Sequence, residues 1–143
     1  MKNKKGFTLI ELLVTIAIIG VLALIGLRYY LYQQDKAKNA IVIANASTVH
    51  TLIQGDLLDH NYPDLPSATG HVIQNIGGNG DPATTLANMK NPYIATGNIA
   101  LLGTLGIGSV GEVIVQWVSQ NAFIIQGIGA GGATIGEVLT AKR

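Results

Sequence analysis

The sequence contains no cysteine, and only 12% of its residues are charged. The missing thiols exclude disulfide bonds, thiolate catalysis and cysteine-based metal sites. Charge is scarce for a soluble protein, and the net charge of +1 leaves no basic surface of the kind that binds nucleic acid. A length of 143 residues is enough for one domain. Apolar residues, by contrast, make up 48% of the chain.

Side-chain arrangements that would support catalysis or cofactor binding are also missing. His50, His60 and His71 do not have metal-ligand spacing, and no Ser/His/Asp or paired-carboxylate cluster stands out. Residues 106–111 and 127–132 match G-x-G-x-x-G, but the first match leads into a strand-like run and the second leaves little chain after it. We expect no cofactor, no metal and no enzymatic activity, and interpret both glycine stretches as turns between strands.

One apolar run dominates the amino-terminal region. From Phe7 to Leu27 the chain reads FTLIELLVTIAIIGVLALIGL, and its one charged residue is Glu11. At about 1.5 Å per residue, a helix of this length spans roughly 31 Å, the thickness of a bilayer core. A charged carboxylate costs on the order of 2.5–3.5 kcal/mol at the centre of the bilayer and less near its edge. Glu11 is therefore a candidate functional residue that needs a partner.

The surroundings of this run differ from those of a secretory signal peptide or a plain anchor. The run is longer than a signal-peptide core, and the residues at 27–30, LRYY, are not a cleavage site. Lys2, Lys4 and Lys5 precede it, which would hold this end in the cytoplasm, and they stop abruptly at Gly6. After the run, helical periodicity continues without a break.

The stretch KKGFTLIELLVTIAIIGVLA, residues 4–23, is similar to the amino terminus of type IV pilins and pseudopilins. The resemblance implies a leader peptide, residues 1–6, which a prepilin peptidase removes between Gly6 and Phe7 before it methylates the new amine of Phe7. It also implies that Glu11 is the family's glutamate. At Arg28 the chain departs from the family, because many members carry there a proline that kinks the helix.

Leader cleavage would explain the carboxylate in the apolar run. It creates a positive amine at Phe7, and in a bundle of such helices Glu11 of one subunit can face the Phe7 amine of a neighbour. In a low dielectric a paired charge is far more favourable than a lone one, so an unpaired Glu11 would penalise the free subunit and pairing would favour assembly. The alternative is that Glu11 stays protonated or reaches the lipid headgroups.

Beyond the apolar run, the helical pattern becomes one-sided and ends before Pro63. Apolar residues recur at helical spacing in a stripe formed by Val42, Ala46, Val49, Ile53 and Leu57. We predict one helix over 7–59, about 80 Å long. Its first half, 7–28, is apolar on all sides and spans the membrane. Its second half, 29–59, is amphipathic and carries the head.

Two glycines are the expected weak points of this helix. Gly20 and Gly26 each lower helix stability by about 1 kcal/mol relative to alanine. Hydrocarbon masks that weakness, because it offers unpaired backbone groups no partner. We therefore expect the segment from Gly20 to Arg28 to be helical in the isolated precursor and to unwind partly in a filament.

The head is predicted to comprise residues 60–143 together with the amphipathic half of the helix. Residues 60–100 read as a loop with one short helix that begins at Asp81, and the last residues, from Thr134, fit either a capped helix or a final strand, which we favour. Earlier strands are expected at 99–102, 112–118 and 122–128, with a hairpin at 119–121 and with Trp117 and Phe123 as packing residues. The fold class is α+β, a long amino-terminal helix packed against a small antiparallel sheet.

These features predict a structural subunit, a major pilin of the type IVa kind. The precursor would lie in lipid of the bacterial inner membrane with its amino terminus in the cytoplasm. After processing by the prepilin peptidase it would polymerise through its amino-terminal helix, with an inner-membrane assembly platform, into an extracellular filament. One alternative is a pseudopilin of a type II secretion or DNA-uptake machine, and another is a membrane-anchored binding or enzymatic domain. Tyr29, Tyr30 and Tyr32 follow the apolar run, where aromatic residues favour the membrane interface.

Overall fold

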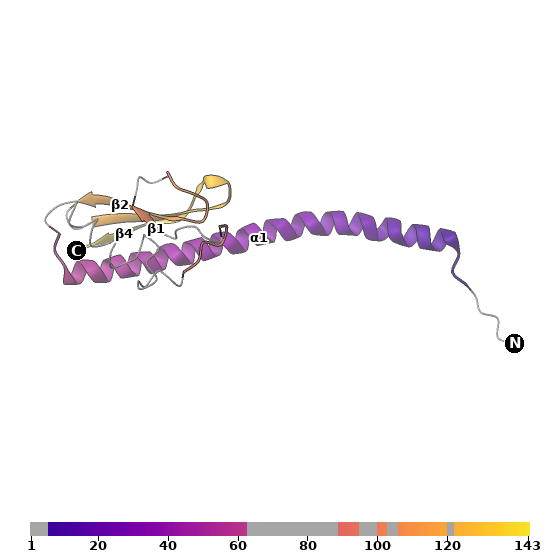
Figure 1. The fold of residues 1–143 in the computed structure, drawn as a ribbon, viewed down its shortest axis with the longest axis horizontal. Coiled ribbons are helices and arrows are strands. Elements are labelled where there is room, and N and C mark those ends of the chain that lie inside the picture. The colour runs from indigo at the N-terminus through magenta and orange to yellow at the C-terminus, as the bar shows by residue number, and fades with distance from the viewer. Residues whose placement is uncertain (1–5, 63–88, 95–99, 103–105, 120–121) are drawn as a thin grey trace. The chain divides into compact units, whose positions relative to one another are not determined.

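The computed structural model describes residues 6–62, 89–94, 100–102, 106–119 and 122–143. Its elements are the helix α1 (Leu9–Asp59), the strands β1 (Ala100–Leu102), β2 (Val113–Ser119) and β3 (Ala122–Ile128), the 3-10 turn η2 (Ala130–Gly132) and the strand β4 (Thr134–Lys142) (Figure 1). The chain divides into two compact units, Met1–Lys36 and Ala37–Arg143, and α1 contributes to both. The short helix predicted to begin at Asp81 lies outside the described residues.

The bounds of α1 agree with the predicted helix to within two residues. The helix is unbroken through Gly20, Gly26 and Arg28, as predicted for the isolated precursor. In the first unit every described side chain, from residue 6 to residue 36, is exposed. By length and composition α1 is able to cross a membrane. The first part of the helix therefore has an apolar surface that its own unit does not cover.

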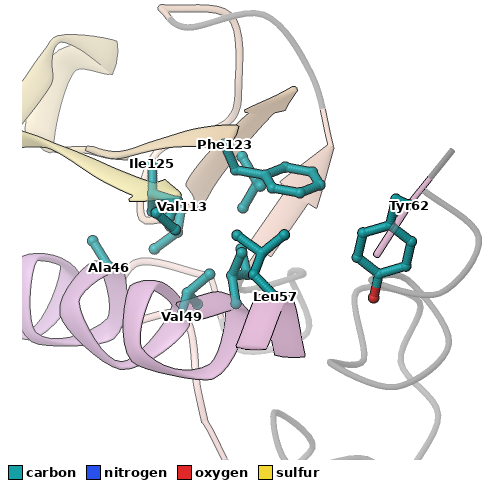
Figure 2. Packing of buried hydrophobic residues seen from close by; sticks show 10 residues of the cluster. Ala46, Val49, Leu57, Tyr62, Val113, Phe123 and Ile125 are labelled. Carbon is teal, nitrogen blue, oxygen red and sulfur yellow. The ribbon is translucent and has the colours of Figure 1, made fainter. Parts of the chain in front are cut away.

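In the second unit the predicted stripe of α1 is buried, and the α+β class is confirmed. The buried apolar residues of α1 are Val42, Ala46, Val49, Ile53 and Leu57, joined by the polar Asn45. Of these, the residues from Ala46 to Leu57 in the apolar stripe form one cluster with Val113 of β2, Phe123 and Ile125 of β3, and Tyr62, which lies beyond Leu57 at the end of the cluster (Figure 2). Trp117 is partly buried against the same core, so its predicted packing role and that of Phe123 are confirmed.

The sheet has the strand order β1-β2-β3-β4. The strands β2, β3 and β4 are antiparallel neighbours, as predicted, and Trp117 pairs with Phe123 across the predicted hairpin. By contrast, β1 pairs with β2 in parallel, with Ala100 opposite Val113. Parallel pairing places the start of β2 at the same end of the sheet as the start of β1, and Gly106 and Gly111, both with positive φ, precede β2. Only the β2–β4 part of the sheet is therefore purely antiparallel.

The carboxy-terminal segment is a strand, so the capped-helix alternative for Thr134 onward is wrong. Ile135 pairs with Gly127 and Leu139 pairs with Ile125, which leaves the intervening residues of β4 as a bulge. Gly136 lies in this bulge with a φ of 76°. A β-carbon at Gly136 would lie 3.2 Å from Cγ1 of Ile43, so glycine also permits the close approach of β4 to α1.

Polar side chains of α1 hold the outer edge of β4. The Gln54 Nε2 donates to the carbonyl oxygen of Lys142 (2.7 Å), and the Lys142 N–H donates to Gln54 Oε1 (3.1 Å). The His50 Nε2 lies 3.2 Å from the carbonyl oxygen of Thr140. These contacts occupy backbone groups at the end of an edge strand that would otherwise be open to pairing with another chain.

A second polar contact fastens the other end of the head to the helix. The Asn39 Oδ1 accepts hydrogen bonds from the Tyr93 hydroxyl (2.7 Å) and from the Ala130 N–H (3.1 Å). The Lys38 ammonium lies 5.1 Å from the centre of the Tyr93 ring, a cation–π arrangement. One helical turn thus holds both the 89–94 segment and the turn between β3 and β4.

Candidate assembly site at the helix amino terminus

Thr8 and Glu11 form a reciprocal cap at the start of α1. The Thr8 N–H and the Thr8 hydroxyl each donate to Oε2 of Glu11 at 2.9 Å. In return, the Glu11 N–H donates to Oγ1 of Thr8 at 3.3 Å. This is a capping box, in which two side chains satisfy backbone donors that the first turn of a helix leaves unpaired.

The capping box is absent from the predictions made from the sequence, although its signal was there. Thr8-Leu9-Ile10-Glu11 matches the S/T-x-x-E pattern immediately before an apolar run. Thr8 is therefore a residue of this site that sequence reasoning missed.

The box adds hydrogen bonds within the free subunit but no counter-charge for Glu11. The Oε2 of Glu11 accepts two hydrogen bonds from Thr8 of its own chain. Its other oxygen, Oε1, accepts no hydrogen bond from the residues that the structure describes. The carboxylate is thus partly satisfied and retains an oxygen that can accept from a second molecule.

A shallow groove surrounds this carboxylate. Its walls are formed by Phe7, Ile10, Glu11, Val14 and Thr15, which are mostly apolar and follow one face of the first helical turns. Phe7 is 85% exposed, so no part of the described chain covers it. The groove presents one acidic group in an apolar surface, an arrangement that suits a partner with an apolar body and one positive charge.

The predicted cleavage position lies in backbone that is not helical. Gly6, Phe7 and Thr8 precede the first helical residue and are exposed. A β-carbon built on Gly6 would meet nothing within 4 Å, so the absence of a side chain there has no structural explanation in the described residues. Peptide bonds in exposed, non-helical segments near a terminus are the ones that proteases reach most readily.

The first glycine-rich stretch has a steric explanation in the head. Gly106 and Gly111 have φ angles of 84° and 87°, which residues other than glycine rarely adopt. A β-carbon on Gly111 would lie 1.9 Å from Oδ1 of Asn91, and one on Gly108 would lie 2.4 Å from Cδ1 of Ile114. The stretch leads into β2, so the turn interpretation holds and no helix follows it as in a dinucleotide site.

The second glycine-rich stretch is only partly a turn. Gly127 belongs to β3, where a β-carbon would lie 2.6 Å from Cγ1 of Val42. A β-carbon on Gly129 would lie 2.8 Å from Oδ1 of Asn39. Only the last glycines, at η2, have positive φ, and the chain continues into β4. These glycines let β3 approach α1 closely, which corrects the prediction that the whole stretch is a turn.

The histidines of the described residues hold structural contacts. His60 Nδ1 lies 3.2 Å from Oδ1 of Asp56, and its ring stacks on Tyr62. The Tyr62 hydroxyl donates a hydrogen bond to Oδ2 of the same aspartate. Burial, together with this bond to a carboxylate, raises the pKa of Tyr62 above its ordinary value. His50 contacts β4, and His71 lies outside the described residues. Among the described residues there is no group of three metal-ligating side chains.

Comparisons with known proteins agree with the amino-terminal site. Residues 1–27 match the family model of the prokaryotic N-terminal methylation motif. The chain is 33% identical to Fimbrial protein Q of Moraxella bovis over 127 residues, which cover 85% of this chain and 81% of that protein. It is also 36% identical over 77 residues to the Type IV major alpha-pilin of Moraxella bovis, covering 54% of this chain and 48% of that protein.

A third relative is named for its dependence on prepilin peptidase and not as a fimbrial protein or pilin. Over 123 residues, 85% of this chain and 79% of the relative, the identity to Prepilin peptidase-dependent protein D of Escherichia coli (strain K12) is 29%. No solved structure matches the chain. Similarity over most of both chains, together with the methylation motif and the helix-plus-sheet fold, shows that this chain belongs to the type IV pilin family.

Proposed function

We propose that this pilin is the major subunit of a type IV pilus, a structural protein and not an enzyme. The observation that carries the proposal is the uncovered first part of α1, where every described side chain up to Lys36 is exposed although most of them are apolar. Such a surface is stable only in lipid or against other helices of the same kind. A filament of amino-terminal helices provides the second environment, and the inner membrane provides the first.

The proposed path begins with processing. A prepilin peptidase removes residues 1–6 at the Gly6–Phe7 bond and methylates the Phe7 amine. The exposed, non-helical backbone around this bond supports the assignment. Lys2, Lys4 and Lys5 hold the precursor's amino terminus in the cytoplasm, residues 7–28 span the inner membrane, and residues 29–143 lie outside it.

Assembly then pairs charges between subunits. The Phe7 amine of one subunit approaches the Glu11 carboxylate of the next and uses Oε1, the oxygen that the Thr8 cap leaves open. Because the cap already satisfies Oε2, the free subunit is destabilised less than a subunit with a wholly unpaired carboxylate would be. The charge pair therefore fixes the axial register of the subunits more than it drives their assembly. An inner-membrane assembly platform is the partner that moves the subunit into the filament.

Three substitutions separate the cap from the charge. Glu11→Gln keeps an N3 side chain that completes a capping box with Thr8 but removes the charge. Thr8→Val keeps the charge and removes the two hydrogen bonds of the Thr8 hydroxyl. Glu11→Leu removes the charge and the hydrogen bonds that the carboxylate accepts. We expect Glu11→Gln and Glu11→Leu to be inserted and trimmed at wild-type levels and to yield no filaments. Thr8→Val should be trimmed and should assemble, with a lower yield.

The readout is the amount of subunit in sheared cell-surface material, with the trimmed subunit in the inner membrane as the reference. Electron microscopy of that material and mass spectrometry of its subunits, which should begin at methylated Phe7, complete the test. Normal filament yield from Glu11→Gln would contradict charge pairing. Surface filaments whose subunits begin at Met1 would contradict the processing step, and a Gly6→Leu variant should accumulate as untrimmed precursor.

A second candidate is a pseudopilin of a secretion machine, favoured by the similarity to Prepilin peptidase-dependent protein D over most of the chain. The same shearing experiment distinguishes the two. A major pilin is recovered in long surface filaments from cells at natural expression levels, whereas a pseudopilin stays with the cell envelope.

A further inference from the structure

A ridge of two cations and a tyrosine follows the apolar run on α1. Arg28, Tyr32 and Lys36 are spaced by four residues, which places them one above the other on the same side of the helix. All three are exposed, and all three belong to the first unit. The Lys36 ammonium lies 5.3 Å from the centre of the Tyr32 ring, so the cation and the ring are already in contact.

No part of the described chain neutralises this ridge. Among the described residues, Arg28 makes no hydrogen bond or ion pair, and the Tyr32 ring is the one polar or charged partner of Lys36. On another side of the helix, the Gln34 Nε2 donates to the Tyr30 hydroxyl at 2.9 Å, so the polar tips of this segment are turned toward one another and toward solvent. Between Glu11 and Asp56 the sequence has one acid, Asp35, against three cations, Arg28, Lys36 and Lys38.

The position of the ridge along the helix points to its ligand. The run from Phe7 to Leu27 matches the thickness of a bilayer core, roughly 31 Å, so Arg28 is the first residue to reach the headgroup layer. Tyrosines favour that layer, and Tyr29, Tyr30 and Tyr32 follow the apolar run directly. A guanidinium and an ammonium offer several N–H donors to a phosphate, and the tyrosine hydroxyl between them offers one more.

We infer that the Arg28–Tyr32–Lys36 ridge binds anionic phospholipid headgroups of the outer leaflet of the inner membrane. This inference rests on the proposed membrane-resident precursor. The precursor then has two basic contacts with lipid, the leader lysines on the cytoplasmic side and the ridge on the other. Leader cleavage removes the first, so the ridge sets the depth at which the trimmed subunit waits before extraction.

The test compares two double substitutions that remove the same charge. Arg28→Gln with Lys36→Gln changes the ridge, and Lys90→Gln with Lys142→Gln changes two exposed cations of the second unit. The full chain is reconstituted into vesicles of phosphatidylcholine mixed equally with phosphatidylglycerol and then extracted in mild detergent. The ratio of the two lipids that remain bound is measured by mass spectrometry. The leader lysines are present in every variant, so a difference between the variants reflects the ridge.

We expect wild type and the control to retain phosphatidylglycerol above its bulk share. The ridge variant should show an enrichment lower by at least about fivefold, because one juxtamembrane basic residue accounts for roughly that preference. Equal enrichment in the ridge variant and the control overturns the inference while leaving the membrane-resident precursor intact. An unchanged lipid ratio with a reduced dimer fraction would instead assign the ridge to a second copy of the chain. Wild-type chain that alkaline washing strips from the vesicles would overturn the precursor proposal and this inference together.

Discussion

The two parts of α1 both contain apolar residues and use them in opposite ways. Up to Lys36 no described side chain of the helix is buried, whereas beyond it six side chains are buried against the head. The difference lies in spacing. In the first part apolar residues lie on all sides of the helix, so no single apolar face packs against the rest of the chain. In the second they follow one stripe, from Val42 to Leu57. Periodicity, more than apolar content, therefore indicates whether a helix packs within its chain or against its surroundings.

The largest expected effect tests this contrast with one residue type. Ile53 is fully buried, and Ile19 is 64% exposed on the same helix. Ile53→Ala should lower the free energy of unfolding of the head by about 2–5 kcal/mol, since it removes buried methyl groups and leaves a cavity. Ile19→Ala should leave it unchanged. Denaturant unfolding in detergent, followed by the fluorescence of Trp117, measures both. Equal losses would mean that the first part of α1 also packs on the head.

The surroundings of the glycines also differ between the two units. A β-carbon on Gly20 or Gly26 would meet nothing within 4 Å, but one on Gly111 would collide with Asn91. Gly111→Ala should cost about 1–2 kcal/mol for its positive φ. It should cost a further 1–3 kcal/mol, approximately, because Asn91 must leave its hydrogen bonds to Val110 and Tyr93.

Gly106→Ala is the matched control for Gly111→Ala. Its φ is 84°, close to the 87° of Gly111, yet a β-carbon there would meet nothing within 4 Å. It should show only the φ contribution in the same unfolding measurement. If both variants lost the same stability, the collision with Asn91 would contribute nothing to the change in the free energy of unfolding.

The features that were predicted correctly from the sequence are those encoded by local patterns. The ends of α1, its buried stripe and the strands β2 and β3 follow from periodicity and from the composition of each segment. The parallel pairing of β1 does not, because pairing direction depends on where a loop returns in space. Likewise the close approach of Gly127 to Val42 joins residues far apart in the chain, and no local pattern records it. The Thr8–Glu11 cap is local and was predictable.

An intermediate effect concerns the end of α1, where the Tyr62 hydroxyl donates a hydrogen bond to Asp56. Tyr62→Phe should lower the free energy of unfolding by about 1.5–3 kcal/mol at neutral pH, because it removes a hydrogen bond to the Asp56 carboxylate. The pKa of Tyr62 is raised in the folded state, so the neutral hydroxyl stabilises the fold below the ordinary tyrosine pKa of about 10. This contribution is lost as the pH rises through the higher, folded-state pKa.

The difference in stability between wild type and Tyr62→Phe should therefore shrink as the pH is raised above about 10. Tyr30→Phe is the matched control, since Tyr30 is 60% exposed and bonds only to Gln34 in the described chain. Its stability should follow that of wild type at every pH. A difference for Tyr62→Phe that stays constant through the alkaline range would show that the hydroxyl's protonation does not matter to the fold.

The smallest expected effect, about 1 kcal/mol per residue, concerns the glycines of the first part of α1. Gly20 and Gly26 lie in unbroken helix here, and nothing nearby requires a glycine at either position. In a bilayer the backbone has no other hydrogen-bond partner, so their weakness has no consequence. In a filament, neighbouring chains and water can satisfy freed N–H and C=O groups. The segment from Gly20 to Arg28 should therefore unwind partly there, even though Arg28 stands where many pilins have proline.

Alanine at both glycines should restore helix to this segment in the filament and leave the trimmed subunit in the membrane unchanged. Gly55→Ala is the matched control, because Gly55 is also helical, exposed and free of neighbours within 4 Å, but lies in the second unit. It should raise head stability by about 0.5–1 kcal/mol without altering the segment from Gly20 to Arg28. Filament maps at side-chain resolution decide the matter: a wild-type map with continuous α-helix through that segment in every subunit would show that glycine alone is too weak to open the helix.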